Sequence, residues 1–142
     1  MSYLKKILAI FIVFLVLITI VNLAPLALMT VEPLYIIENN DKYPHNATVK
    51  VTGNGGEYSE NTTYHLEPEE SVSVEKPITL LIKWSNPFKK GYQYYASGDY
   101  RYHVIFENTS VTYYSTPHLV NTVKFKLINE NGNFYVHVSE YS

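Results

Sequence analysis

The segment Val120–Glu140, with the sequence VNTVKFKLINENGNFYVHVSE, contains the strongest structural signal in the chain. Apolar and polar residues alternate on both sides of Asn131-Gly132, which is typical of strands that have one buried face. Asn-Gly is the preferred two-residue loop of a type I′ hairpin, because both residues tolerate positive φ. This loop predicts the cross-strand pairs Leu127–Val136, Phe125–Val138, Ile128–Tyr135, Lys126–His137 and Lys124–Ser139. We therefore expect a C-terminal β-hairpin with most of its apolar residues on one face.

The same alternation continues upstream of this hairpin. Ala47–Thr52 has the pattern of a half-buried strand, and Val72 and Val74 form a shorter piece. Ile78–Trp84 has an apolar residue at every second position, which predicts a further strand. The residues expected on the buried face of that strand are Ile78, Leu80, Ile82 and Trp84.

A second hairpin is expected between Tyr100–Phe106 and Val111–Ser115, with its turn near Asn108-Thr109. Its predicted pairs are Phe106–Val111 and Val104–Tyr113. In total, seven or eight short strands alternate with turn residues, and we find no helical period beyond the N-terminal segment. This pattern predicts an antiparallel β-sandwich over residues 32–142, of Ig-like or cupredoxin-like type.

The N-terminal segment 7–31 carries no charged residue. A bilayer core about 30 Å thick requires roughly 20 apolar residues in a helix, so this segment is long enough to span a membrane. Lys5 and Lys6 precede it, whereas Glu32 follows it. The positive-inside rule therefore places residues 1–6 in the cytoplasm and the domain at residues 32–142 outside the cell.

Two fates remain open for this segment. Cleavage by signal peptidase requires small residues at positions −3 and −1, but cutting after Ala24 places Asn22 at −3 and cutting after Ala27 places Pro25 there. Both sites are poor, and the apolar run is longer than that of a signal peptide. The sequence thus favours an uncleaved signal anchor over a secreted domain.

The composition excludes several classes of function. The chain of 142 residues has no cysteine, so disulfides, thiol catalysis and cysteine-ligated metals or clusters are excluded. A net charge of −2 gives no sign of a nucleic-acid partner, since binding phosphates requires a basic face. The chain is also rich in tyrosine, with 14 residues.

Three stretches resemble the small extracytoplasmic β-sandwich domains of archaeal envelope proteins. They are LYIIENND (34–41), HNATVKV (45–51) and YHLEPEESV (64–72). The family pattern runs from a strand through an Asn/Asp turn to H-x-x-T-V-x-V and then Y-x-L-x-P-G-E-S. Glu69 stands where that pattern has glycine. The resemblance implies a membrane-anchored sandwich in the cell envelope, and it implies no catalytic activity.

Three N-x-S/T sequons begin at Asn46, Asn61 and Asn108 and are candidate glycosylation sites on an exported domain. A segment rich in tyrosine, from Gly91 to Tyr102, is a candidate interaction surface for a protein or a glycan, because tyrosine combines an apolar ring with a polar tip. The alternative is that these rings cap the open end of the sandwich. The candidate tyrosines are Tyr92, Tyr94, Tyr95, Tyr100 and Tyr102.

No pattern indicates a metal, a cofactor or a catalytic site. The five histidines, at positions 45, 65, 103, 118 and 137, lie too far apart in sequence to form a recognisable ligand motif, and surface or loop positions explain them better. The sequence contains no nucleophile elbow and no phosphate loop, and Asp41 and Asp99 fall in predicted turns. We therefore expect a protein that is not an enzyme.

The sequence is best interpreted as a single-pass membrane protein that displays one β-sandwich for interaction or structure in the cell envelope. The alternative is a subunit of a surface filament or larger membrane complex, in which the apolar helix packs against its copies. The chain lacks the leader glycine and the glutamate that type IV pilins carry at the start of the apolar run, which disfavours that kind of filament.

Overall fold

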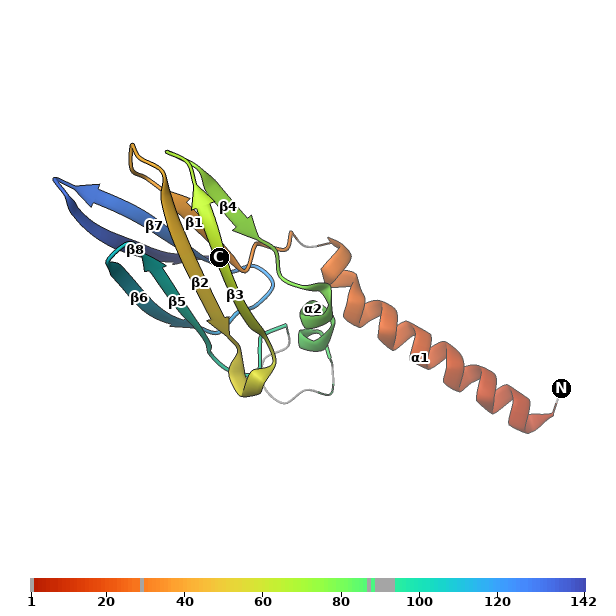
Figure 1. Ribbon diagram of the computed structural model, residues 1–142. Helices are drawn as coiled ribbons and strands as arrows, with labels where there is room; N and C mark the ends of the chain where they lie inside the picture. Colours follow the sequence, from red (N-terminus) through yellow and green to blue (C-terminus); the bar gives the residue numbers. More distant parts are fainter. Residues whose placement is uncertain (1, 29, 87, 89–93) are drawn as a thin grey trace.

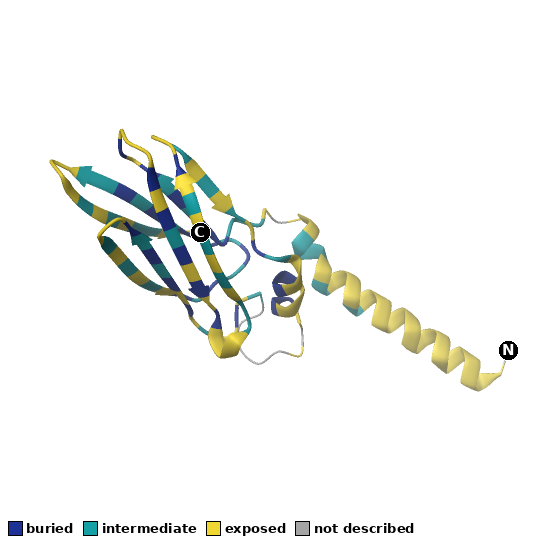
Figure 2. Ribbon diagram, viewed as in Figure 1, coloured by how far each residue is buried: buried dark blue, intermediate teal, exposed yellow. Residues whose placement is uncertain are grey.

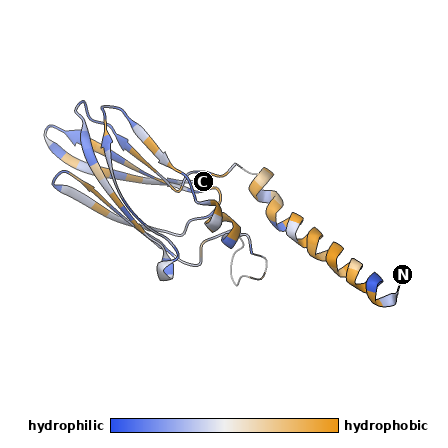
Figure 3. Cartoon of the chain, turned by 45° about the vertical axis from the view of Figure 1, so that its right-hand side comes forward, coloured by the Kyte–Doolittle hydropathy of each residue, from blue (hydrophilic) through white to orange (hydrophobic). Residues whose placement is uncertain are grey.

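The computed structural model describes residues 2–28, 30–86, 88 and 94–142. A helix of 26 residues, α1 (Tyr3–Leu28), projects from a domain made mainly of β-strands (Figure 1). The side chains of α1 are exposed along almost its whole length and are nearly all apolar (Figures 2 and 3). The helix is long and apolar enough to cross a membrane, in agreement with the prediction for this segment.

Within the described residues, eight strands form two packed four-stranded sheets. The first sheet has the order β4-β1-β7-β8 and the second the order β3-β2-β5-β6. The strands are β1 (Tyr35–Asn39), β2 (His45–Thr52), β3 (Ser59–Leu66), β4 (Ser71–Val74), β5 (Tyr100–Phe106), β6 (Thr109–Ser115), β7 (Thr122–Glu130) and β8 (Asn133–Tyr141). A short 3₁₀ turn, η1 (Asn54–Gly56), joins β2 to β3.

The first sheet is mixed, which corrects the prediction of a wholly antiparallel sandwich. β1 runs parallel to β7, with Ile37 opposite Phe125, and antiparallel to β4. A parallel pair requires a long crossover, and here the chain from β2 to β6 supplies it. Local alternation can indicate that a segment is a strand, but it carries no information on the direction of the neighbouring strand.

Aromatic side chains fill much of the space between the two sheets. Tyr35, Tyr102 and Phe125 are fully buried. The ring of Tyr102 lies 6.3 Å from that of Tyr35 and 5.8 Å from that of Phe125. Burial of rings of this size contributes much of the stability of the domain.

The predicted C-terminal hairpin is confirmed. β7 and β8 pair in the expected register, including Leu127 with Val136 and Phe125 with Val138. Asn131 and Gly132 form the loop with φ values of 55° and 86°, as a type I′ turn requires.

The second hairpin forms with a different register. Val104 pairs with Val111 and Phe106 with Thr109, so the predicted pairing is displaced by two residues. The loop consists of Glu107 and Asn108, and Glu107 has a φ of 45°. Such a conformation is unfavourable for glutamate, and a contact with the distant His45, described below, accompanies it.

The strand predicted at Ile78–Trp84 is a helix, α2 (Ile78–Trp84). Leu80, Leu81 and Trp84 are its buried residues, and their spacing places them on one helical face. Pro77 is the N-cap residue, and its carbonyl accepts the first hydrogen bonds of the helix, from the amides of Leu80 and Leu81. The consecutive apolar residues from Leu80 to Ile82 violate strict alternation and were the available signal for a helix.

Candidate functional site

The junction between α1 and the sandwich centres on a buried lysine. Lys76 lies between β4 and α2, is 5% exposed, and donates hydrogen bonds to three carbonyl oxygens. These belong to Glu32, Pro33 (3.0 Å) and Asn121 (2.7 Å). Burial lowers the pKa of Lys76 to about 8. These hydrogen bonds hold the segment that follows α1 against the β4–α2 connection, which carries Lys76, and the β6–β7 connection, which carries Asn121.

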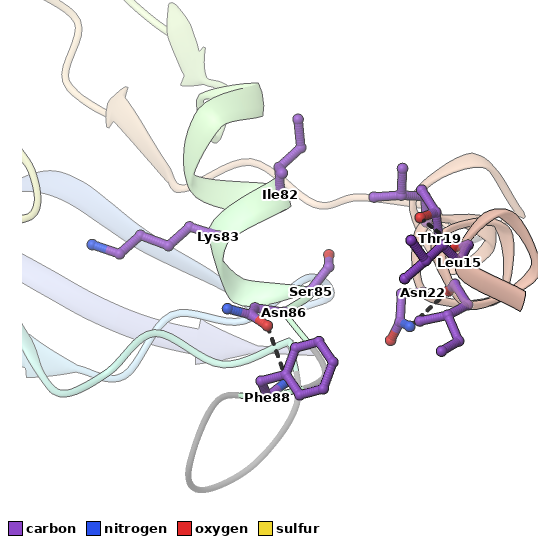
Figure 4. A pocket seen from close by; sticks show the side chains of 10 residues that line it. Leu15, Thr19, Asn22, Ile82, Lys83, Ser85, Asn86 and Phe88 are labelled. Carbon is purple, nitrogen blue, oxygen red and sulfur yellow. Dashed lines mark hydrogen bonds between the residues drawn. The ribbon is translucent and has the colours of Figure 1, made fainter. Parts of the chain in front are cut away.

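An open groove of about 460 Å³ separates α1 from α2 (Figure 4). Ile82 and Phe88 contribute apolar side chains from the domain and are 51% and 85% exposed. Ile78, on the same helix, is 61% exposed. The remaining lining residues are Leu15, Ile18, Thr19, Asn22 and Leu23 of α1, and Lys83, Ser85 and Asn86 of the domain.

A second open pocket, of about 680 Å³, lies at the end of the sandwich away from α1 (Figure 1). It is formed by the hairpin turns β5–β6 and β7–β8 and by the β1–β2 connection, which crosses from one sheet to the other. The lining residues are Tyr43, Pro44, His45, Glu107, Asn108, Thr109, Gly132, Asn133 and Phe134. We call it the distal pocket.

His45 connects the three turns of the distal pocket. The ring is 8% exposed, and its Nε2 lies 2.6 Å from Asp41 Oδ2 while its Nδ1 lies 2.7 Å from Glu107 Oε1. The ring of Phe134 meets it edge-on at 5.3 Å, and the Asn129 amide donates to Asp41 Oδ2 at 3.3 Å. With a carboxylate at each nitrogen, the doubly protonated imidazolium is the form that satisfies both contacts.

The electrostatics of this cluster follow from burial and charge. Burial of the ring acts to lower the pKa of His45, but the hydrogen bonds to Glu107 and Asp41 outweigh it, and the pKa is raised. The hydrogen bond from His45 holds the pKa of Asp41 below its usual range. The expectation of surface histidines is therefore wrong for His45. The sequence signal was weak, since Glu107 is 62 residues away.

Two of the five candidate tyrosines belong to the core. Tyr100 and Tyr102 have no exposed surface, because both point from β5 toward the opposite sheet. Burial raises the pKa of both hydroxyls. Several tyrosine hydroxyls in the domain donate to glutamates: Tyr100 to Glu57 (2.6 Å), Tyr35 (3.0 Å), Tyr58 (2.8 Å) and Tyr64 (3.3 Å) to Glu60, and Tyr113 to Glu140 (2.9 Å). The high tyrosine content thus has a structural use in this fold.

The other three candidate tyrosines have different settings. Tyr92 lies outside the described residues. Tyr94 is half-buried, with a φ of 67°. Tyr95 is 37% exposed and stacks on His118, with the ring centroids 4.4 Å apart. Tyr94 and Tyr95 are the described candidates that retain exposed surface.

The three sequon asparagines are all exposed. Asn46 on β2 and Asn61 on β3 belong to adjacent strands and point away from the core, on the outer face of the second sheet. Asn108 lies in the β5–β6 turn at the rim of the distal pocket. These positions leave room for a glycan, and glycosylation itself stays a prediction.

The four remaining histidines are spread over the domain, and their contacts are polar or aromatic. His65 contacts Asn46 and Glu67, His103 contacts Thr112, and His118 stacks on Tyr95. His137 lies opposite Lys126 in the register of β7 and β8. In the described part of the chain, no group of three or more histidine and acidic side chains is placed to hold a metal ion.

Comparison with known proteins adds no name to this site. No family model matches the chain, and no curated protein matches it significantly. The long apolar helix followed by two packed sheets agrees with the architecture that the resemblance implies, but no family is identified. The structure gives a physical reason for the glycine in the pattern. Glu69, at that position, has a φ of 63°, a conformation that glycine adopts without strain.

Proposed function

We propose that this chain is a single-pass membrane protein that displays its sandwich on the outside of the cell, as an interaction or structural component of the envelope. Helix α1 serves as an uncleaved signal anchor, with residues 1–6 in the cytoplasm. The observation that carries the proposal is the contrast between α1, which has no buried residue in its described part, and the well-packed domain behind it. Lipid is the environment that such a helix requires.

The junction supports an anchor that stays attached. Leu26 and Val31 pack against the core of the domain, and the Glu32 amide donates to the Leu119 carbonyl at 3.0 Å. The residues around Ala24 are helical, whereas signal peptidase requires an accessible site with small residues at −3 and −1. These contacts hold Val31 and Glu32 against the domain, so few residues separate the sandwich from the bilayer.

The distal pocket is the surface that an anchored sandwich presents to its surroundings. It lies at the opposite end from α1 and combines the aromatic rings of Tyr43 and Phe134 with the half-exposed carboxylate of Glu107. Concave sites of this composition suit the binding of a partner protein or a glycan. The proposal gives the chain no catalytic step and no cofactor.

The proposal is tested by isolating the chain from its native membranes. We expect a species with the full mass of 16.4 kDa that resists extraction by alkaline carbonate and requires detergent. A chain that lacks residues up to Ala24 or Ala27 and appears in the soluble fraction would contradict the anchor and favour a secreted domain.

A filament or membrane-complex subunit is the second candidate, and the groove beside α1 is the observation that favours it. Thr19 and Asn22 line this groove three residues apart, and polar residues of this kind are common at helix–helix contacts in membranes. Chemical cross-linking in intact membranes distinguishes the two candidates. A ladder of regular multimers favours the assembly, whereas a monomer favours the display protein.

A further inference from the structure

We infer that α2 and Phe88 form a foot that rests in the outer leaflet of the membrane, and that lipid fills the groove between α1 and α2. The foot consists of Ile78, Ile82 and Phe88. The inference rests on the proposed function, because it requires α1 to stay in the bilayer.

The first argument is the distribution of apolar side chains on α2. Leu80, Leu81 and Trp84 face the core, so the outer face of the helix would be polar if it met water. Instead, Ile78 and Ile82 are more than half exposed on that outer face. Ile78 and Ile82 thus form an apolar strip on the outer side of α2, beside the polar Thr79 and Lys83, and this strip requires a second apolar environment.

The second argument is the position of this face. Ile82 and Phe88 form the wall of the groove opposite α1, so the apolar side of the foot and the apolar helix meet the same space (Figure 4). The contacts of Lys76 hold the start of the domain against the segment that follows α1. These contacts keep the connection to α2 close to the point where the chain enters the domain.

The third argument is depth. Thr19 and Asn22 of α1 line the groove six to nine residues before the helix ends at Leu28, which is about 9–14 Å along the axis. Interfacial helices bury their apolar face about 5–10 Å into the boundary between headgroups and acyl chains. Polar side chains from the domain, Ser85 and Asn86, also line the groove. Because Leu15 also lines the groove, about 20 Å before the end of the helix, the groove extends from the headgroup boundary into the acyl region.

Lipid is the occupant that these arguments favour over a second copy of the chain. The α1 wall of the groove, from Leu15 to Leu23, belongs to the membrane-spanning helix and is therefore bathed in acyl chains. Lys83 also lines the groove, but its ammonium pairs with Glu57 at 3.1 Å, so its charge is paired on the domain side. The exposed apolar side chains of Ile82 and Phe88 remain for contact with lipid.

The absence of cysteine from the chain allows a clean test with single labels. The full-length protein is reconstituted in vesicles of phosphatidylcholine and phosphatidylglycerol, with a nitroxide on Ile82→Cys, Val13→Cys or Ser71→Cys. Val13 lies in the apolar helix, and Ser71 is exposed at the start of β4. The accessibility of each label to oxygen and to a water-soluble nickel chelate is then measured. Emission from Trp84, which is fully buried, checks that each variant is folded.

The inference predicts that the labels at Ile82 and Val13 are several-fold more accessible to oxygen than to nickel, with Val13 the deeper. The label at Ser71 should show the opposite preference. An aqueous Ile82 with a lipid-embedded Val13 would overturn the foot and leave the anchor standing. An aqueous Val13 would overturn the anchor itself. A label at Ile82 that neither reagent reaches would indicate packing against a second copy, and would also overturn lipid as the occupant.

Discussion

Truncation of Phe125 to alanine should destabilise the domain far more than truncation of its neighbour Lys124. Phe125 is fully buried between the sheets, and its ring lies 5.8 Å from that of Tyr102. Lys124 points from the same strand to the outer face, where its ammonium lies 2.5 Å from Glu38. The two residues are neighbours in sequence, but one side chain lies in the core and the other on the outer face of the sheet.

The expected magnitudes follow from these environments. Removing a buried phenylalanine costs about 3–5 kcal/mol, because the transfer free energy is lost and a cavity remains. The Lys124–Glu38 pair is partly exposed, and such pairs contribute about 0.2–1 kcal/mol. With an m-value of about 1.5 kcal/mol/M, Phe125→Ala should lower the urea midpoint by about 2–3 M and Lys124→Ala by less than about 1 M.

The assay is urea unfolding of the detergent-solubilised chain, followed by emission from Trp84. This residue is the single tryptophan of the sequence and is fully buried, so unfolding shifts its emission to longer wavelength. Equal midpoints for Phe125→Ala and Lys124→Ala would refute the reasoning, because a slip of one residue in the β7–β8 register exchanges the two faces.

Three further predictions concern the rest of the domain. Glu69→Gly should raise the free energy of unfolding by up to about 1 kcal/mol in urea titrations, because glycine adopts the observed φ of 63° without strain. The pKa of His45 is raised in the folded state, so its contribution to stability is present below a pH of about 6.5 and is lost as pH rises through the folded pKa. His45→Gln should remove this part of the pH dependence of thermal unfolding, and an unchanged profile would contradict the contacts with Glu107. A chain that begins at Val31 should be soluble, β-rich by circular dichroism and cooperative in unfolding, because it keeps the acceptors of Lys76. Aggregation would indicate that α1 belongs to the fold.

The parts of the fold that local chemistry decides were predictable. The Asn131-Gly132 loop and the alternation around it determine the register of the C-terminal hairpin, and both strands follow it. The helix α2 was missed because seven residues are too few to separate a strand period from a helical one when three neighbours are apolar. The parallel β1–β7 pair depends on a crossover that no local pattern encodes.

The candidate sites depended more strongly on tertiary contacts. His45 is bracketed by Asp41, four residues away, and by Glu107, which lies on another hairpin. Lys76 follows Glu75 in the short connection between β4 and α2, and nothing in that sequence indicates that the carbonyls of Glu32 and Asn121 surround it. In both cases the partner atoms come from segments more than 40 residues apart, and their meeting is a property of the fold rather than of a motif.

Orientation in the membrane is the central claim, and labelling of single cysteines tests it most directly. Ser142→Cys and Ser2→Cys place one thiol at each end of a chain that has no other. A membrane-impermeant maleimide added to intact cells should label Ser142→Cys, whereas it should reach Ser2→Cys only after lysis. Labelling of Ser2→Cys in intact cells, with Ser142→Cys protected until lysis, would contradict the account and place the sandwich in the cytoplasm.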